Sequence, residues 1–184
     1  MTAVLTAPAN PAATRRPAPS ALTPLELVEY TRFLATEVRS GRYPYIDYNA
    51  EQRWHQRIYR DRRVDVWLIS WLPTQGTQLH DHGGSAGAFT VVSGTLSEAV
   101  YVPSRNGLRE RDQPAGRSVG FDGRYVHDVR NTSDRPAVSV HAYSHPLTSM
   151  NYYDVGPGGL AHLAELFTDD PEAEFGNGSP ASRR

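Results

Sequence analysis

Short alternating segments of apolar and polar residues dominate the chain from residue 57 onward. VDVWLISWL (64–72), TLSEAVYV (95–102) and PAVSVHAYS (136–144) are rich in β-branched and aromatic residues. AFTVVSG, RSVGF and YVHDVRN have the same character, and Gly, Pro or Asn stands between the segments. Many short strands at such spacing predict an antiparallel sandwich or a small β-barrel.

Residues 22–40 follow a helical period instead. Thr23 can cap the helix, Pro24 suits its first position, and Glu26 lies three residues after Thr23, as in a capping box. Apolar residues recur at helical spacing, and Gly41 can end the helix; the recurring residues are Leu27, Tyr30, Leu34 and Val38. A second, short helix is expected over residues 158–167.

Length and composition indicate one globular domain. The 184 residues can bury a core, and 39% hydrophobic with 21% charged residues is ordinary globular composition. Residues 1–20 and 169–184 are rich in small, polar or turn-forming residues, so we expect two flexible tails around a single domain at 21–168. The net charge of −1 gives no case for a nucleic-acid partner, and no apolar run approaches the about 20 residues of a membrane span. Without an export signal, we expect a cytoplasmic monomer.

A pair of histidines marks the candidate chemistry. His80 and His82 stand two apart, and residues i and i+2 of a strand face the same side. Two such imidazoles could bind a divalent metal, with each nitrogen at about 2.0–2.2 Å from the metal. His127, on a later segment, is the candidate for the third ligand. The chain has no cysteine, so His, Asp or Glu must supply the ligands. The competing interpretation is a surface turn, because Asp81 and the glycines that follow are turn residues.

A second group of polar residues lies on the segment 136–144. Ser139, His141 and Tyr143 alternate with Val and Ala, so the three would share one strand face. Buried, they need hydrogen-bond partners and could form a Ser–His–Tyr relay. The pattern alone favours equally a solvated polar face with the apolar face buried.

The glycines and histidines around HDHGGSAGAF and GRYVH resemble the two motifs of the cupin superfamily. Together with IYRD and VSVHAYS they resemble the cysteine dioxygenase family, in its bacterial form, over roughly residues 55–147. The resemblance implies a mainly β fold, a cupin-type small β-barrel (double-stranded β-helix) with an N-terminal helical lead-in. Gly87 stands where most cupins have a further glutamate ligand and where animal members have a cysteine crosslinked to tyrosine, so neither is expected here. His145 stands where relatives often have proline.

The resemblance also implies residue roles. His80, His82 and His127 would bind Fe(2+), and Ser139, His141 and Tyr143 would be the outer relay. Arg60 would bind the substrate carboxylate, preceded by Tyr59; a shift in register would pass the role to Arg62. The implied reaction is oxidation of L-cysteine by O2 to cysteine sulfinic acid, with both oxygen atoms added to sulfur.

Three alternatives stay open. A related dioxygenase could act on 3-mercaptopropionate or another thiol acid, although an arginine at position 60 favours cysteine. A cupin with zinc, manganese or nickel could catalyse isomerisation or hydrolysis, since imidazoles do not select a metal by affinity alone. A non-catalytic barrel could bind a sugar or a small acid.

Most arginines in the cluster Arg57, Arg60, Arg62 and Arg63 are expected to be solvated, and Trp54, Trp67 and Trp71 to belong to the core.

Overall fold

The computed structural model describes residues 20–43, 45–171 and 173. Helix α1 (Pro24–Arg39) has the predicted start: the Thr23 side chain accepts from the Glu26 amide, and the Glu26 carboxylate accepts from the Thr23 amide at 2.7 Å. Gly41, with φ +83°, follows its C-cap at Ser40. No helix in the described part of the chain is long and apolar enough to cross a membrane.

In the described part of the chain, eleven strands form two antiparallel sheets, with a 3-10 turn at Pro103–Arg105 after β5. The first sheet has the order β1-β2-β9-β4-β7. Its strands are β1 (His55–Arg60), β2 (Asp65–Trp71), β9 (Ala137–Ser144), β4 (Ala86–Ser93) and β7 (Ser118–Phe121). The second sheet has the order β11-β10-β3-β8-β5-β6. Its strands are β11 (Gly159–Leu166), β10 (Met150–Gly156), β3 (His80–Asp81), β8 (His127–Arg130), β5 (Thr95–Val102) and β6 (Gly107–Pro114).

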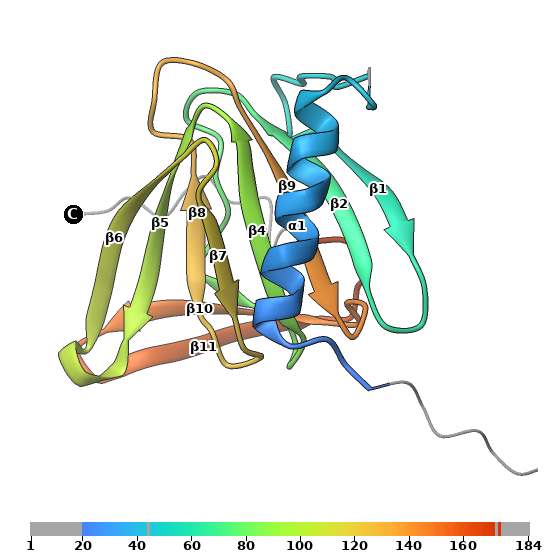
Figure 1. The fold of residues 1–184 in the computed structure, drawn as a ribbon. Helices are drawn as coiled ribbons and strands as arrows, with labels where there is room; N and C mark the ends of the chain where they lie inside the picture. The colour runs from blue at the N-terminus through green and yellow to red at the C-terminus, as the bar shows by residue number, and fades with distance from the viewer. Residues whose placement is uncertain (1–19, 44, 172, 174–184) are drawn as a thin grey trace, which may run out of the picture.

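The helix covers the outer face of the first sheet, as Figure 1 shows for α1 across β4 and β9. One apolar cluster lies between helix and sheet and includes Leu27, Leu34, Val66 and Val140. The other lies inside the barrel, between the two sheets; it includes Trp67, Ile69, Trp71, Phe89, Leu96 and Phe121. The mainly β, cupin-type architecture with a helical lead-in is therefore confirmed.

Both faces of β9 are buried, which resolves the two interpretations of the segment 136–144. Val138, Val140 and Ala142 face the helix. Ser139 and His141 of β9 pair with Ile69 and Trp67 of β2. Because Ile69 and Trp67 belong to the cluster inside the barrel, Ser139 and His141 face the barrel interior too. The alternative of a solvated polar face is wrong because this face lies inside the barrel, where Ser139, His141 and Tyr143 are at most 5% exposed.

The helix expected over residues 158–167 is wrong. This segment is strand β11, which pairs along its length with β10 through a hairpin. Its exposed and half-buried residues alternate only weakly, and its alanines and leucines have good helix propensity. The segment is a strand because it pairs with β10, and the local residue pattern does not reveal this pairing.

Candidate metal centre

Three histidines from two short strands converge inside the barrel. His80 on β3 pairs directly with His127 on β8, and His82 follows β3 by one residue. All three are at most 3% exposed, and one ring nitrogen of each lies within 4.8 Å of the other two. The HDH segment is therefore not a surface turn: His80, Asp81 and His82 are all buried.

Asp81 and the glycines after it hold this geometry. The Asp81 carboxylate accepts from the Gly83 amide, from Asn151 and from the Tyr153 hydroxyl, all at 2.7–2.9 Å. Gly83 has φ +58°, and a Cβ there would lie 2.6 Å from the Ser149 carbonyl oxygen. Only glycine fits this tight turn, which directs His82 back toward His80.

Hydrogen bonds at the far side of the rings fix two of the histidines. Nδ1 of His80 lies 2.7 Å from the Gln78 carbonyl oxygen, and Nδ1 of His127 lies 2.9 Å from Oε1 of Glu98. Both acceptors require an N–H at Nδ1, which leaves a lone pair at Nε2 of each ring. Nδ1 of His82 is buried without a hydrogen-bond partner.

Burial favours the neutral form of His80 and His82. Burial, with the neighbouring histidines, lowers the pKa of His80 to about 3 and that of His82 well below its ordinary value. Neutral rings are the form that binds metal. The lone pairs of three buried imidazoles that face one another repel. A metal cation that accepts all three lone pairs would relieve this repulsion, so the group fits a metal site.

The residues expected to form a relay are joined by hydrogen bonds. Nε1 of Trp71 donates to Oγ of Ser139 at 2.9 Å, Ser139 contacts Nε2 of His141 at 2.9 Å, and Nδ1 of His141 lies 3.3 Å from the Tyr143 hydroxyl. In the tautomer with the proton on Nδ1, the Ser139 hydroxyl donates to Nε2 and Nδ1–H donates to the Tyr143 hydroxyl. Burial lowers the pKa of His141 to about 3, which suits a neutral ring.

The relay ends beside the histidine group. The Tyr143 ring lies 4.8 Å from the His82 ring between centroids, and Phe121 stacks on His82 at 4.9 Å. The six residues predicted as ligands and relay thus occupy one interior region. Gly87, the position without a side chain, pairs with Tyr143 on one side and with Phe121 on the other.

Tyr59 and Arg60 lie on opposite sides of the first sheet. The register of β1 shifts between Arg57 and Tyr59, so Tyr59 pairs with Val66 and packs edge-on against Tyr30 of α1. The structure does not bring Tyr59 together with the histidines. Arg60 pairs with Asp65 and forms an ion pair with Asp169.

Arg57 lies on the interior side next to Arg60. Its guanidinium stacks over the Trp67 ring at 4.3 Å and donates to Asp169 at 2.9 Å. Trp67 pairs with His141, so Arg57 lies in the row that leads to the relay. The residue pattern does not single out Arg57, because the register shift in β1 is not visible in the sequence. Asp169, placed in the expected C-terminal tail, contacts β1 through both arginines.

Glu98 is a second residue near the histidines that was not predicted from the sequence. It is 1% exposed and faces the same interior, with its carboxylate against His127. An acidic residue at an inward position between Leu96 and Val100 was the available signal. His145, by contrast, is exposed, and His162 is an exposed partner of Asn151.

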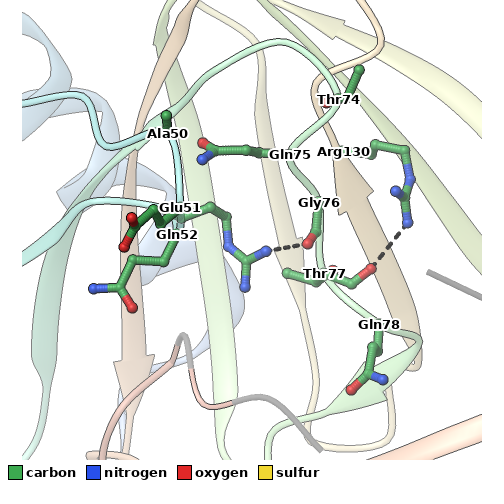
Figure 2. Close-up of a pocket in the computed structure, with 10 residues that line it drawn as sticks. Ala50, Glu51, Gln52, Thr74, Gln75, Gly76, Thr77, Gln78 and Arg130 are labelled. Atoms are coloured by element: carbon green, nitrogen blue, oxygen red, sulfur yellow. Dashed lines mark hydrogen bonds between the residues drawn. The ribbon is translucent and has the colours of Figure 1, made fainter. Parts of the chain in front are cut away.

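A cavity of about 220 Å³ is lined by residues 50–53, 74–78 and Arg130. Figure 2 shows its wall formed by the loop from Thr74 to Gln78, with Arg130 donating to the Thr77 carbonyl. None of the three histidines lines it. Its link to the centre is the Gln78 carbonyl, which orients His80.

A sequence model of the family "Cysteine dioxygenase type I" matches residues 29–156, which include all three histidines and the relay. The chain belongs to the cysteine dioxygenase type I family. Cysteine dioxygenase type 1 of Danio rerio is 29% identical over 105 residues, covering 52% of this chain and 52% of that protein. The chain thus spans about half the length of this curated relative.

Two solved structures are similar at lower sequence identity. A Thermus thermophilus protein is 23% identical with a TM-score of 0.48, over 54% of this chain and 89% of that one. A Klebsiella pneumoniae protein with a double-stranded β-helix domain is 14% identical with a TM-score of 0.49, over 69% and 88%. Neither likeness bears on function. Family membership and the three-histidine group together define a cysteine dioxygenase-type chain with a candidate metal centre.

Proposed function

We propose that this protein is an iron(II)-dependent thiol dioxygenase that converts L-cysteine and O2 to cysteine sulfinic acid. The observation that carries the proposal is the meeting of a buried three-histidine group with the Ser139–His141–Tyr143 chain, beside His82. Membership of the cysteine dioxygenase type I family supports it. The cytoplasmic location and the monomeric state stay predictions.

The reaction is balanced without a further reductant. The thiol sulfur loses four electrons, O2 takes up four, and both oxygen atoms bond to sulfur, so RSH and O2 give RSO2H. Iron(II) held by His80, His82 and His127 would supply coordination of the thiolate and activation of O2. Three neutral ligands leave the charge of the cation uncancelled by its ligands, which favours binding of an anionic thiolate.

The chain's own residues would position the substrate. Arg60, or Arg57 beside it, offers a guanidinium for a substrate carboxylate through a charge-assisted, bidentate pair. Such a pair would fix the sulfur relative to the metal centre. His141 donates to Tyr143, so the Tyr143 hydroxyl can donate in turn to a substrate oxygen, and Ser139 holds His141 in the required tautomer.

Oxygen uptake tests the proposal. Protein reconstituted with iron(II) is supplied with L-cysteine or with 3-mercaptopropionate, and the products are identified by mass spectrometry. Uptake with L-cysteine and formation of the sulfinate is the expected result. Uptake with 3-mercaptopropionate alone would keep the reaction and change the substrate. No uptake at full iron occupancy would overturn the proposal, and metal analysis of the protein as purified would then test zinc, manganese and nickel.

A further inference from the structure

Glu98 is a buried carboxylate that the proposed reaction does not use. It lies on β5, pairs with Val129 of β8 and is 1% exposed. Burying a carboxylate is costly unless its oxygens receive hydrogen bonds or a counter-charge. Its surroundings therefore indicate what it is for.

Three donors from different strands and loops converge on Glu98. Nε2 of Gln113 donates to Oε2 at 2.9 Å, and the Tyr125 hydroxyl donates to Oε1 at 3.1 Å. Nδ1 of His127 lies 2.9 Å from the same Oε1. An amide, a phenol and an imidazole N–H can all donate, and a carboxylate with two oxygens can only accept, so the set matches the anionic form.

The phenol stays a donor. Burial and the Glu98 carboxylate beside it raise the pKa of Tyr125 above its ordinary value. The Gln113 amide is 4% exposed and cannot change its charge. Gln113 and Tyr125 therefore hold the carboxylate in one orientation without neutralising it, and His127 is the one partner that leads toward the metal centre.

We propose that Glu98 is a positioning residue that acts on the metal through His127. Its acceptor at Nδ1 fixes the His127 tautomer and aims Nε2 at the centre, and it increases the electron density that the ring can donate. It also places a buried negative charge next to the metal site, separated from the metal only by the His127 ring. This charge would partly balance the charge of a metal that is held by three neutral ligands. His80 has only a backbone carbonyl at the equivalent nitrogen.

This inference rests on the proposed metal centre but not on dioxygenase activity. Two substitutions separate charge from shape. Glu98→Gln keeps the size of the side chain and an oxygen acceptor but removes the charge, whereas Glu98→Asp keeps the charge and shortens the side chain. Glu110→Gln, on the exposed face of the neighbouring strand β6, is the matched control because it loses the same charge at the surface.

The first measurement is iron(II) affinity, by competition with a chromophoric chelator, together with the absorption spectrum of the cobalt(II) form. The second is the midpoint potential of the iron(III)/iron(II) couple. Loss of an outer partner of a ligating histidine typically costs 10–100-fold in metal affinity. We expect Glu98→Gln to lose affinity by about that factor and to raise the potential, Glu98→Asp to keep the potential near that of the unmodified protein, and Glu110→Gln to change neither.

Equal affinity and potential in Glu98→Gln and the unmodified protein would overturn the inference, even if the variant melts at a lower temperature. If Glu98→Gln does not fold, a potential in Glu98→Asp that is raised at unchanged metal geometry would overturn it as well. Weaker metal binding by Glu98→Gln in a protein that shows no oxygen uptake would overturn the proposed reaction and leave the role of Glu98 intact. The two proposals therefore fail separately.

Discussion

Gly87 and Phe121 lie opposite each other on β4 and β7, and the Phe121 ring fills the space that a side chain at position 87 would need. A Cβ at position 87 would lie well inside van der Waals contact of that ring and 3.1 Å from the Tyr143 ring. Phe121 in turn stacks on His82. The glycine is therefore required by the packing of an aromatic ring against a metal-ligand candidate.

Gly87→Ala should destabilise the protein by about 1–3 kcal/mol, because an overpacked core must shift to admit the methyl group. The displaced ring is Phe121, so metal affinity should fall with stability. Urea unfolding and chelator competition measure the two effects. Gly107→Ala is the control, since its Cβ would meet only the Arg105 carbonyl oxygen at 3.6 Å.

A second substitution can restore the space. Phe121→Leu in the Gly87→Ala background removes the clashing ring atoms and should recover part of the lost stability. Strict additivity of the two substitutions would contradict the steric explanation, because residues in contact are expected to couple.

The relay can be tested at its end. Tyr143→Phe removes the hydroxyl that His141 contacts but keeps the ring beside His82. Turnover with L-cysteine should fall by about 10²-fold if the hydroxyl donates to the reacting group, while stability changes by about 1 kcal/mol and iron content does not change. Tyr101→Phe, whose hydroxyl contacts Asn106 away from the centre, should leave kcat unchanged. An unchanged kcat in Tyr143→Phe would exclude this role.

Asp65 gives the stability a distinctive pH dependence. Its carboxyl is 0% exposed, neither oxygen has a hydrogen bond of ordinary geometry, and burial raises its pKa from 3.8 to about 6. The folded state then binds this proton more tightly than the unfolded chain. The stabilising contribution is fully present below about pH 4 and is lost as the pH rises through about 6, a decrease of about 3 kcal/mol.

Asp65→Asn removes the titrating group at nearly constant shape. The difference in unfolding free energy, variant minus unmodified protein, should therefore grow in favour of the variant between about pH 4 and pH 7. Urea unfolding followed by circular dichroism over this range measures it. A difference that stays constant with pH would mean that the Asp65 pKa is not raised.

The residues of the centre could be predicted from sequence because short-range alternation places them. His80 and His82, and the set Ser139, His141 and Tyr143, keep their spacing of two and therefore a shared direction. The residue pattern does not reveal contacts between residues that are distant in sequence. The pairing of β11 with β10, the shifted register at Tyr59 and the contact between Glu98 and His127 each depend on a partner distant in sequence. The alternation also does not show that a helix covers the outer face of β9.

The two arginines on β1, Arg57 and Arg60, share one acidic partner. Asp169 accepts from both Arg57 and Arg60, so its carboxylate occupies the position where we propose a substrate carboxylate binds. These ion pairs are partly exposed. Hydrogen bonds from Arg60 and Arg57 lower the pKa of Asp169, so the Asp169 carboxylate is charged at neutral pH. Asp169→Asn should lower KM for L-cysteine because it weakens this internal competitor without removing either guanidinium.

Arg57→Ala and Arg60→Ala identify the guanidinium that binds substrate. Loss of a charge-assisted hydrogen bond, worth about 1.5–3 kcal/mol, should raise KM for L-cysteine by about 10–150-fold in the variant that lacks the anchor. Cysteamine, which has the thiol and amine but no carboxylate, should be affected little, so the ratio of kcat/KM for the two thiols is the decisive measurement. If that ratio is unchanged in both variants, neither arginine binds the carboxylate, and Asp169→Asn should then leave KM unchanged too.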